Sequence, residues 1–328
     1  NEGYRTWHGE PFKEGYLQAP PSDHFDLHYQ GAATDTKYKP YELIPGLNIG
    51  GFFDAGDFDI ETGSNISVVE NFIRAWEIFK PQRDETFVSQ KQRYVDLHRP
   101  DGIPDILQFI EHGTLNLVAQ AEQIGHMAST LSNSVLDNYH HLGDAASITD
   151  GLHYDPSLKP YEVSVDGKRS GTPDDMWAFT TRNPVLDFRA ATMFAAASRV
   201  MKGYNDELAE RALTQSRRLM KEASELMKTH TNAHASMATN LQLFGATREN
   251  QYLDKFLQQI WDALDSDLAL HMQTALDAVP YTDEAYKKRL RPYVEKYQTY
   301  IENFDTQNPY GVPIGLGNWA GVNAVLNF

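Results

Sequence analysis

The chain has 328 residues, 41% of them hydrophobic, enough to bury a large core in one large domain or two medium ones. Acidic residues outnumber basic ones by 45 to 29, for a net charge of -16, so the surface repels phosphate backbones and nucleic acid is not an expected partner. Because the chain has no cysteine, disulfides, thiolate metal sites and thiol nucleophiles are excluded. It has no apolar run of about 18 residues, so we expect no membrane span.

The N-terminal residues 1–50 are rich in Gly, Pro, Tyr and His and show little periodicity, which predicts an irregular extended segment. This segment leads into residues 50–57, which have the sequence Gly-Gly-Phe-Phe-Asp-Ala-Gly-Asp. Only Ala and Gly separate Asp54 from Asp57, and such small residues let the backbone turn tightly and a substrate come close. The competing interpretation is a turn whose Asp side chains bond their own backbone. We interpret the motif as two carboxylates placed for chemistry.

The same stretch superficially resembles a calcium loop, because Asp57, Asp59 and Glu61 alternate. The EF-hand pattern fails, since Gly63 is one position late and the twelfth position is Val68. We therefore assign no metal ligands here.

Helical patterns follow the acidic motif. Ser64 and Asn65 are predicted to cap a helix with an apolar stripe, and Pro104 lies in the first turn of a second helix. The apolar residues of these stripes are Ile66, Val69, Phe72, Ile73 and Trp76 in the first, and Ile106, Leu107, Ile110, Leu115 and Val118 in the second.

Residues 126–183 form a long polar segment rich in His, Asp, Gly and Pro, and a loop of that length inside a compact protein is usually functional or disordered. Its aromatic residues favour order. It is also the largest loop available to wall a binding cleft. His140 and His141 lie within it, but no H-E-x-x-H pattern accompanies them, so we expect no zinc site.

From Pro184 onward the helical pattern is nearly continuous, and no stretch alternates with period two for long. The sequence therefore predicts an all-α fold with seven to nine helices. Trp76 and Trp261 lie on apolar helical stripes and are predicted to be core residues. The helices of this second half are predicted at 184–201, 205–229, 232–244, 249–264, 266–278 and 283–303.

Four blocks of the sequence resemble glycoside hydrolase family 9, which contains cellulases and related β-glucanases. Residues 51–57 resemble the family signature Gly-Gly-Trp-Tyr-Asp-Ala-Gly-Asp, and residues 101–107, 183–201 and 308–313 resemble three further segments in the family's order. The similarity runs from about residue 45 to the end of the chain.

The resemblance implies an (α/α)6 barrel, incomplete in this chain, as a single catalytic domain over 1–328 that includes the irregular segment 1–50. It implies an inverting hydrolase of β-1,4-linked glucan, with Asp57 as the general base and Asp54 holding the water. No cofactor is required. Calcium occurs in the family, but no motif places it here. The resemblance also implies a secreted, periplasmic or cell-surface protein.

The family's general acid is a Glu near the C-terminal end, after a segment with a functional His and Arg. Nothing after Asn308 matches either segment, so we expect this chain to be a piece of a longer domain, with the acid beyond Phe328. Glu295 and Glu302 lie on an amphipathic helix and are interpreted as solvated. The alternatives are a non-catalytic carbohydrate-binding protein on the same scaffold, an inactive fragment, or another (α/α)6 glycosidase or lyase.

Candidate sugar contacts lie in the loops. Trp177 and Trp319 occur at loop-to-helix junctions, where such a barrel builds its cleft, and either stacking on sugar or burial in the core would suit them. His140, His141 and Tyr310 are the other candidate substrate-binding residues.

Overall fold

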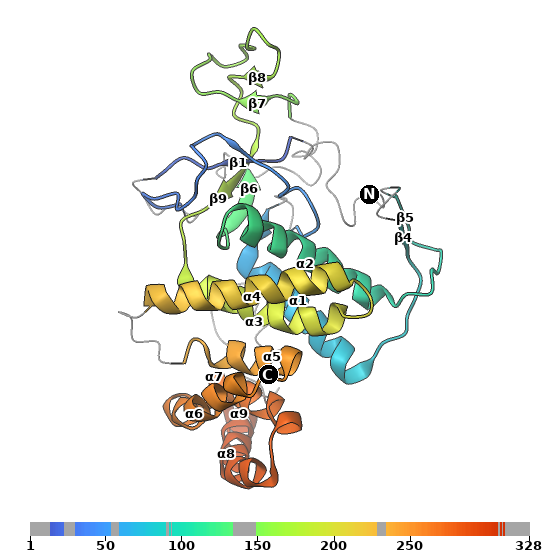
Figure 1. Ribbon diagram of the computed structural model, residues 1–328, viewed down its shortest axis with the longest axis vertical. Coiled ribbons are helices and arrows are strands. Elements are labelled where there is room, and N and C mark those ends of the chain that lie inside the picture. The colour runs from blue at the N-terminus through green and yellow to red at the C-terminus, as the bar shows by residue number, and fades with distance from the viewer. Residues whose placement is uncertain are drawn as a thin grey trace. The chain divides into compact units, whose positions relative to one another are not determined.

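The computed structural model describes residues 14–22, 30–53, 59–89, 92, 94–133, 149–227, 234–307, 309 and 311. The chain divides into two compact units, Asn1–Arg248 and Glu249–Phe328. The first contains a small five-stranded sheet and the helices α1 to α5, and the second contains α6 to α9 (Figure 1). A single catalytic domain over 1–328 stays a prediction.

The first unit is built largely of helices, and α3 occupies the predicted residues 184–201. Its start follows from the local sequence: the Asn183 side chain accepts a hydrogen bond from the Val185 N–H, and Pro184 occupies the first turn, where its missing N–H does no harm. The helices of this unit are α1 (Thr62–Phe79), α2 (Asp105–Gln123), α3 (Pro184–Met201), α4 (Asp206–Leu226) and α5 (Met237–Thr247).

The start of α1 differs from the prediction that Ser64 and Asn65 cap it. The helix begins at Thr62 after Glu61, whose side chain makes no capping bond. Ser64 lies inside the first turn and donates to the Glu61 carboxylate at 3.2 Å. Asn65 is buried, and its amide bonds the backbone of a neighbouring segment. The local sequence suggested a cap because Ser and Asn are preferred at the N-cap position. The position of Asn65 is instead set by hydrogen bonds to Phe52, which lies 13 residues earlier in the chain.

The main core lies between α1, α2, α3 and α4. The alanines of α3 let α4 approach closely, so that the Ser216 hydroxyl of α4 donates to the Ala191 carbonyl of α3 at 2.6 Å. Trp76 packs partly buried against this cluster, in line with its predicted core role. The largest fully buried side chains of the cluster include Ile66, Ile110, Leu117 and Phe194.

The five-stranded sheet has the order β2-β1-β9-β6-β3. The pairing of β1 with β9 is parallel, and the other pairings are antiparallel. One face of the sheet carries a second apolar cluster that includes Tyr16, Ile60, Leu131 and Ala178. The strands are β1 (Tyr16–Gln18), β2 (Leu43–Ile44), β3 (Ile60–Glu61), β6 (Thr130–Asn133) and β9 (Met176–Phe179).

This sheet corrects two details of the sequence analysis. Residues 1–50 contribute β1 and β2, and residues 126–183 contribute β6 and β9 rather than loop alone. Each strand has two to four residues, too few to show alternation in the sequence. Two further pairs lie outside the sheet: β4 (Phe87–Ser89) with β5 (Tyr94–Asp96), and β7 (His153–Tyr154) with β8 (Arg169–Ser170).

The regular secondary structure of the second unit is helical throughout its described residues. Asp267 and Asp283 cap α7 and α8 by accepting hydrogen bonds from backbone N–H groups, at 3.0 and 2.9 Å. Glu295 and Glu302 lie exposed on α8, as predicted. The elements are α6 (Asn250–Ser266), α7 (Leu268–Asp277), a 3₁₀ turn (Val279–Tyr281), α8 (Glu284–Glu302) and α9 (Phe304–Gln307).

The helices fall close to their predicted positions, and α1 to α9 match the upper end of the predicted number within the part of the chain that the structure describes. None of these helices is both long and apolar enough to cross a membrane.

Replacing Gly113 by Ala tests the contact between α1 and α2. A Cβ at Gly113 would lie 2.3 Å from Val69 Cγ2 and 2.9 Å from Phe52 Cε2. Overpacking of this kind costs about 1–3 kcal/mol, which exceeds the gain of about 0.5–1 kcal/mol from replacing a helical Gly by Ala. We expect G113A to lower the free energy of unfolding in chemical denaturation. Adding Val69→Ala should relieve part of the clash. The double variant should therefore lose less unfolding free energy than the sum of the losses in the two single variants.

Candidate functional site

Six of the residues that the sequence analysis singled out lie outside the described residues: Asp54, Asp57, His140, His141, Tyr310 and Trp319. Trp177 lies within them, on β9. The structure therefore defines the candidate site through the residues that flank the acidic motif on both sides and through the surroundings of Trp177.

The segment that leads into the acidic motif, residues 50–53, passes directly over α2. Gly50 and Gly51 have φ angles of 58° and 85°, in the region that favours glycine. The Gly51 N–H donates to the His112 carbonyl at 3.0 Å, and a Cβ on Gly50 would lie only 2.2 Å from that oxygen. The two glycines are thus required both for the turn and for the close approach to α2.

Phe52 anchors this segment in an aromatic group on α1 and α2. Its ring lies edge-on to His112 with centroids 5.1 Å apart, and tilted against Phe72 and Phe109 at 6.1 and 6.4 Å. Phe53, the next residue, is 37% exposed. The path of the backbone into Asp54 is therefore set by a packed side chain rather than by the turn alone.

A buried polar network behind the segment joins three elements. The Asn116 amide donates to the Leu47 carbonyl at 3.1 Å, and the Gln120 amide donates to Asn116 Oδ1 at 2.9 Å. Gln120 Oε1 accepts from the Thr62 hydroxyl at 3.1 Å and from the Ala128 N–H at 3.2 Å. Sequence reasoning missed these residues, since polar side chains four apart on a helix normally indicate a solvated face.

The sheet brings Trp177 to the same face as Asp59, the first described residue after the acidic motif. Ser132 of β6 pairs with Trp177 of β9, and Ile60 pairs with Leu131. Continuing that register places Asp59 opposite Ser132, so Asp59, Ser132 and Trp177 form one row on the face opposite the apolar cluster. Because neighbouring strands lie about 4.8 Å apart, the backbones of Asp59 and Trp177 are roughly 10 Å apart.

Trp177 is half-buried and lies among other aromatic rings. Tyr41 meets it at 5.8 Å with an interplanar angle of 67°, and Phe179 at 6.3 Å and 49°, so neither ring is stacked flat on the indole. The indole N–H of Trp177 and the hydroxyl of Ser132 have no hydrogen-bond partner among the described residues. Such buried polar groups need a partner, which a water molecule or a sugar hydroxyl would supply.

Close to this aromatic group, four carboxyl groups gather at the base of the segment 150–175. We call Glu14, Asp150, Asp174 and Asp175 the acidic neck. Asp174 Oδ2 accepts from the Asp150 N–H at 2.5 Å, and Asp175 Oδ2 accepts from the Tyr154 N–H at 2.6 Å. Figure 1 shows β7 and β8 projecting away from the sheet strands β1, β6 and β9. The neck therefore ties together the two ends of the projecting segment.

The charge state of the neck follows from its burial. Asp175 is 1% exposed, and its Oδ1, like that of Asp174, accepts no hydrogen bond within the described residues. Burial is the largest cause that raises the pKa of Asp175 to about 8, and the charges of Asp174, Glu14 and Asp150 act in the same direction. Burial also raises the pKa of Glu14 and of Asp174. At neutral pH the neck therefore keeps a proton on Asp175.

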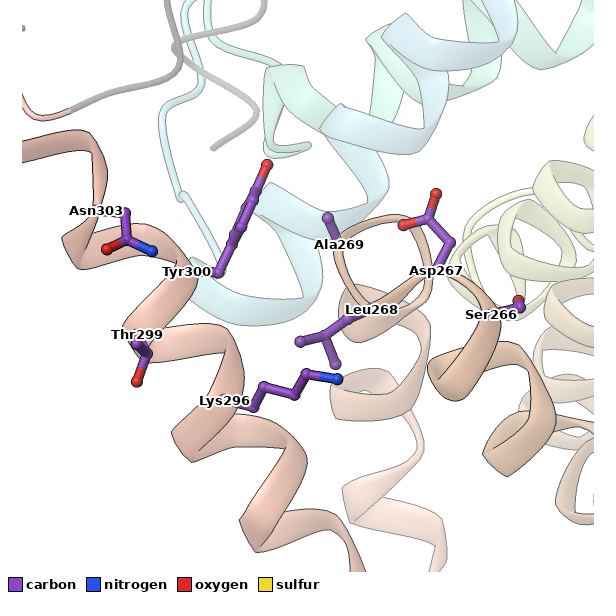
Figure 2. Close-up of a pocket in the computed structure, with 8 residues that line it drawn as sticks. All are labelled: Ser266, Asp267, Leu268, Ala269, Lys296, Thr299, Tyr300 and Asn303. Carbon is purple, nitrogen blue, oxygen red and sulfur yellow. The ribbon is translucent and has the colours of Figure 1, made fainter. Parts of the chain in front are cut away.

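Among the described residues, neither a metal centre nor the two cavities of the second unit compete with this candidate site. In the described ranges, no three His, Cys, Asp or Glu side chains are grouped so that they could hold a metal ion. The second unit has a cavity of about 540 Å³. Figure 2 shows Lys296 and Tyr300 of α8 on one side of it and Leu268 and Ala269 of α7 on the other. Its one carboxylate, Asp267, is engaged as the cap of α7, so the cavity lacks a pair of acids.

A second cavity of about 460 Å³ in the same unit is aromatic. Trp261, predicted as a core residue, lines it, with Tyr286 at 5.0 Å between ring centroids and the Arg289 guanidinium 4.2 Å from the indole. Trp261 is half-buried, so the apolar stripe of α6 packs only part of it.

Comparison with known proteins identifies the fold. No family model and no curated protein matches the chain. Among solved structures, the family 9 endoglucanase J30 aligns with 98% of this chain and 56% of its own, at 14% identity and a TM-score of 0.60. A metagenome-derived family 9 endoglucanase aligns over 95% of this chain and 54% of its own, at 16% identity and 0.58.

A third structure, AaCel9A in complex with a cellobiose-like isofagomine, aligns over 84% of this chain and 51% of its own, at 12% identity and 0.56. The chain thus has the fold of family 9 glycoside hydrolases, the (α/α)6 barrel that the sequence resemblance predicted, and it spans about half the length of these structures.

Replacing Asp175 by Asn tests the acidic neck through the pH dependence of stability. The folded protein binds the Asp175 proton more tightly than the unfolded chain does, so the free energy of unfolding falls as pH rises from about 4, the ordinary Asp value, through about 8. Asn stays neutral throughout. We expect D175N to exceed the wild type at pH 9 by at least about 1 kcal/mol, and the gap to close towards pH 4.

The matched control is Asp166→Asn on the same projecting segment. A hydrogen bond from the Ser164 hydroxyl lowers the pKa of Asp166, and the residue is exposed, so its carboxylate favours the folded state at high pH. D166N should therefore shift stability at pH 9 in the opposite direction. Parallel denaturation curves for D175N and wild type across this pH range would contradict a proton on Asp175.

Proposed function

We propose that the protein acts in the inverting hydrolysis of β-1,4-linked glucan, with Asp57 as general base and Asp54 holding the attacking water. The observation that carries this proposal is the pair Asp54 and Asp57, three residues apart behind a Gly-Gly-Phe-Phe segment, in a chain with the fold of endoglucanases. The net charge of -16 is compatible with a neutral polysaccharide and unfavourable for a polyanion.

The chemistry requires two carboxyl groups with different tasks. The base removes a proton from water as the water oxygen bonds to the anomeric carbon, and the bond to the leaving oxygen breaks while an acid protonates that oxygen. In inverting enzymes the two groups lie about 6.5–9.5 Å apart to leave room for the water. Asp57 and Asp54 serve the water side, and the proposal assigns the acid to no residue of this chain.

A binding surface on the sheet, near the strand that follows the acidic motif in sequence, supports the proposal. Trp177 lies on β9, which is separated from β3 by one strand, β6. The row that contains Trp177 includes the Ser132 hydroxyl, which has no hydrogen-bond partner within the described part of the chain. An aromatic face beside hydroxyl and N–H groups is suited to a sugar ring, which has apolar faces and polar edges. Trp319, Tyr310, His140 and His141 are the other proposed contacts. The reaction uses no cofactor, and we place the protein outside the cytoplasm with its polymeric substrate.

Asp57→Asn is expected to abolish hydrolysis of β-cellobiosyl fluoride. Fluoride leaves without full protonation, so this substrate needs the base and not the acid. Its hydrolysis therefore reports on Asp54 and Asp57 alone. We expect the rate of fluoride release by D57N to be at least about 100-fold lower than that of the wild type. The unfolding transition of D57N should be unchanged. Asp59→Asn, two residues on, is the control with a smaller loss. Equal release by D57N and wild type would overturn the base assignment.

The same protein is expected to hydrolyse unsubstituted β-glucan only at background rate, because none of residues 1–328 is proposed as the acid. Reducing-end assays on barley β-glucan and soluble cellulose derivatives measure this. Full activity of residues 1–328 on β-glucan would contradict the acid assignment. Glucan binding with no base-dependent fluoride release would instead favour the non-catalytic carbohydrate-binding protein.

Trp177→Ala is expected to weaken binding of cellotetraose by about tenfold, or about 1.4 kcal/mol, because it removes the aromatic face. Trp177→Phe keeps a ring and should lose less. Trp261→Phe in the second unit is the control, since Trp261 is also half-buried among tyrosines. Titration calorimetry measures the affinities, and an affinity for W177A equal to that of the wild type would remove Trp177 from the binding surface.

A further inference from the structure

The aromatic cavity of about 460 Å³ in the second unit has an apolar wall on α6 and a cationic group on α8. Leu253, Leu257 and Trp261 follow one another at intervals of four residues on α6, so they lie on one face of that helix. All three residues are half-buried. Apolar surface therefore stays open in a cavity whose volume falls within the range of about 300–1,000 Å³ that is usual for small-molecule sites.

The cationic group is the guanidinium of Arg289, which lies over the indole of Trp261 at 4.2 Å from the ring centroid. A guanidinium that contacts a ring through its face keeps five N–H donors at its edge, and that edge matches the two oxygens of a carboxylate. Arg289 makes no hydrogen bond or ion pair within the described part of the chain. The indole therefore holds the guanidinium in place while its donors stay available.

The sequence around Arg289 concentrates positive charge in a chain whose net charge is -16. Residues 287–291 are Lys-Lys-Arg-Leu-Arg, so four of these five side chains are cationic. Among the described residues only Lys287 of this group has an ion pair, with Glu284 at 2.6 Å. This turn of α8 therefore favours an anionic ligand over a neutral or cationic one.

Three other polar side chains of the lining are engaged with the backbone. The Thr282 hydroxyl donates to the Ala278 carbonyl at 3.0 Å, and the Tyr286 hydroxyl donates to the Ala275 carbonyl at 2.9 Å. The Asp283 carboxylate accepts the Tyr286 N–H at 2.9 Å, where the positive end of α8 offsets its charge. A sugar needs partners for many hydroxyl groups, and each hydroxyl buried without one is costly. The cavity is therefore better suited to an apolar ring with one anionic group.

From these contacts we propose that the cavity is a binding site for an aromatic carboxylate. The ring of the ligand packs against Leu253 and Leu257, and its carboxylate pairs with the edge of the Arg289 guanidinium. Carboxyl groups ordinarily titrate near about pH 4, so such a ligand is an anion at neutral pH. The site uses residues of the second unit alone, and it does not depend on the hydrolysis proposed for Asp54 and Asp57.

Titration calorimetry with 2-naphthoate tests the proposal. Its amide, 2-naphthamide, has the same rings without the charge, and acetate has the charge without the rings. We expect naphthoate to bind at least about tenfold more tightly than either compound, and cellotetraose not to displace it. Equal affinities for naphthoate and naphthamide would overturn the proposal. Displacement of naphthoate by cellotetraose would identify a sugar site and would also overturn it.

Arg289→Met and Arg291→Met form a matched pair of variants. Each removes one positive charge from an exposed position of α8, but residues two apart on a helix face in different directions, and Arg291 does not line the cavity. We expect R289M to lower the affinity for naphthoate about tenfold and to leave that for naphthamide within about twofold. R291M should leave both within about twofold. Equal losses of naphthoate affinity in the two variants would assign the effect to net charge and overturn the proposal.

Two further variants test the geometry of the site. Arg289→Lys keeps the charge but replaces the planar guanidinium by an ammonium group, so its affinity for naphthoate should lie between those of R289M and the wild type. Ala285→Leu fills part of the cavity from α8 and should weaken the binding of naphthoate and naphthamide alike. Unfolding transitions measured beside the titrations confirm that each variant is folded. Wild-type affinity for naphthoate in folded A285L would place the ligand outside this cavity and overturn the proposal.

Discussion

The amide of Gln120 is the contact on which the arrangement of the first unit depends. It lies on α2 and bonds Thr62 at the start of α1, Ala128 before β6 and Asn116, which in turn bonds the Leu47 carbonyl. Helix, sheet and the segment leading to the acidic motif therefore share one buried network. Because each group in such a network loses its partner when one member moves, the three elements hold a common position.

The helices could be predicted because their cause is local. Residues 184–201 carry their own cap, a Pro in the first turn and a continuous small-residue face, and α3 occupies that range. Strands β1 and β9 could not be predicted, because three or four residues show no period and their partners lie far along the chain. The prediction that Asn65 caps α1 is wrong for the same reason. Its residue type suits a cap, but its hydrogen-bond partner Phe52 precedes the helix by ten residues.

In the candidate site, too, local features could be predicted from the sequence and long-range ones could not. The acidic motif is contiguous, so its spacing alone suggests chemistry at Asp54 and Asp57, which stays a prediction. Gly50 and Gly51 have the positive φ that their residue type suggests. The acidic neck combines Glu14 with Asp150, Asp174 and Asp175, which only the folded chain brings together. No local pattern marks Asp175 as a buried, protonated acid, since its neighbours in sequence read as a polar loop. Burial, rather than residue type, sets its charge.

The parallel pairing of β1 with β9 has a consequence for the order in which the chain folds. Tyr16 pairs with Met176 and Gln18 with Ala178, and the Gln18 amide donates to the Thr180 hydroxyl at 2.7 Å. A ribosome must therefore synthesise the chain from β1 through Phe179 at the end of β9 before β1 meets this neighbour. Until then β1 can pair only with β2, and a two-stranded ribbon is marginal in water. Helices α1 and α2, whose backbone hydrogen bonds are local and which both precede β9 in the chain, can form earlier. The N-terminal strand joins the sheet late, after a long loop has closed.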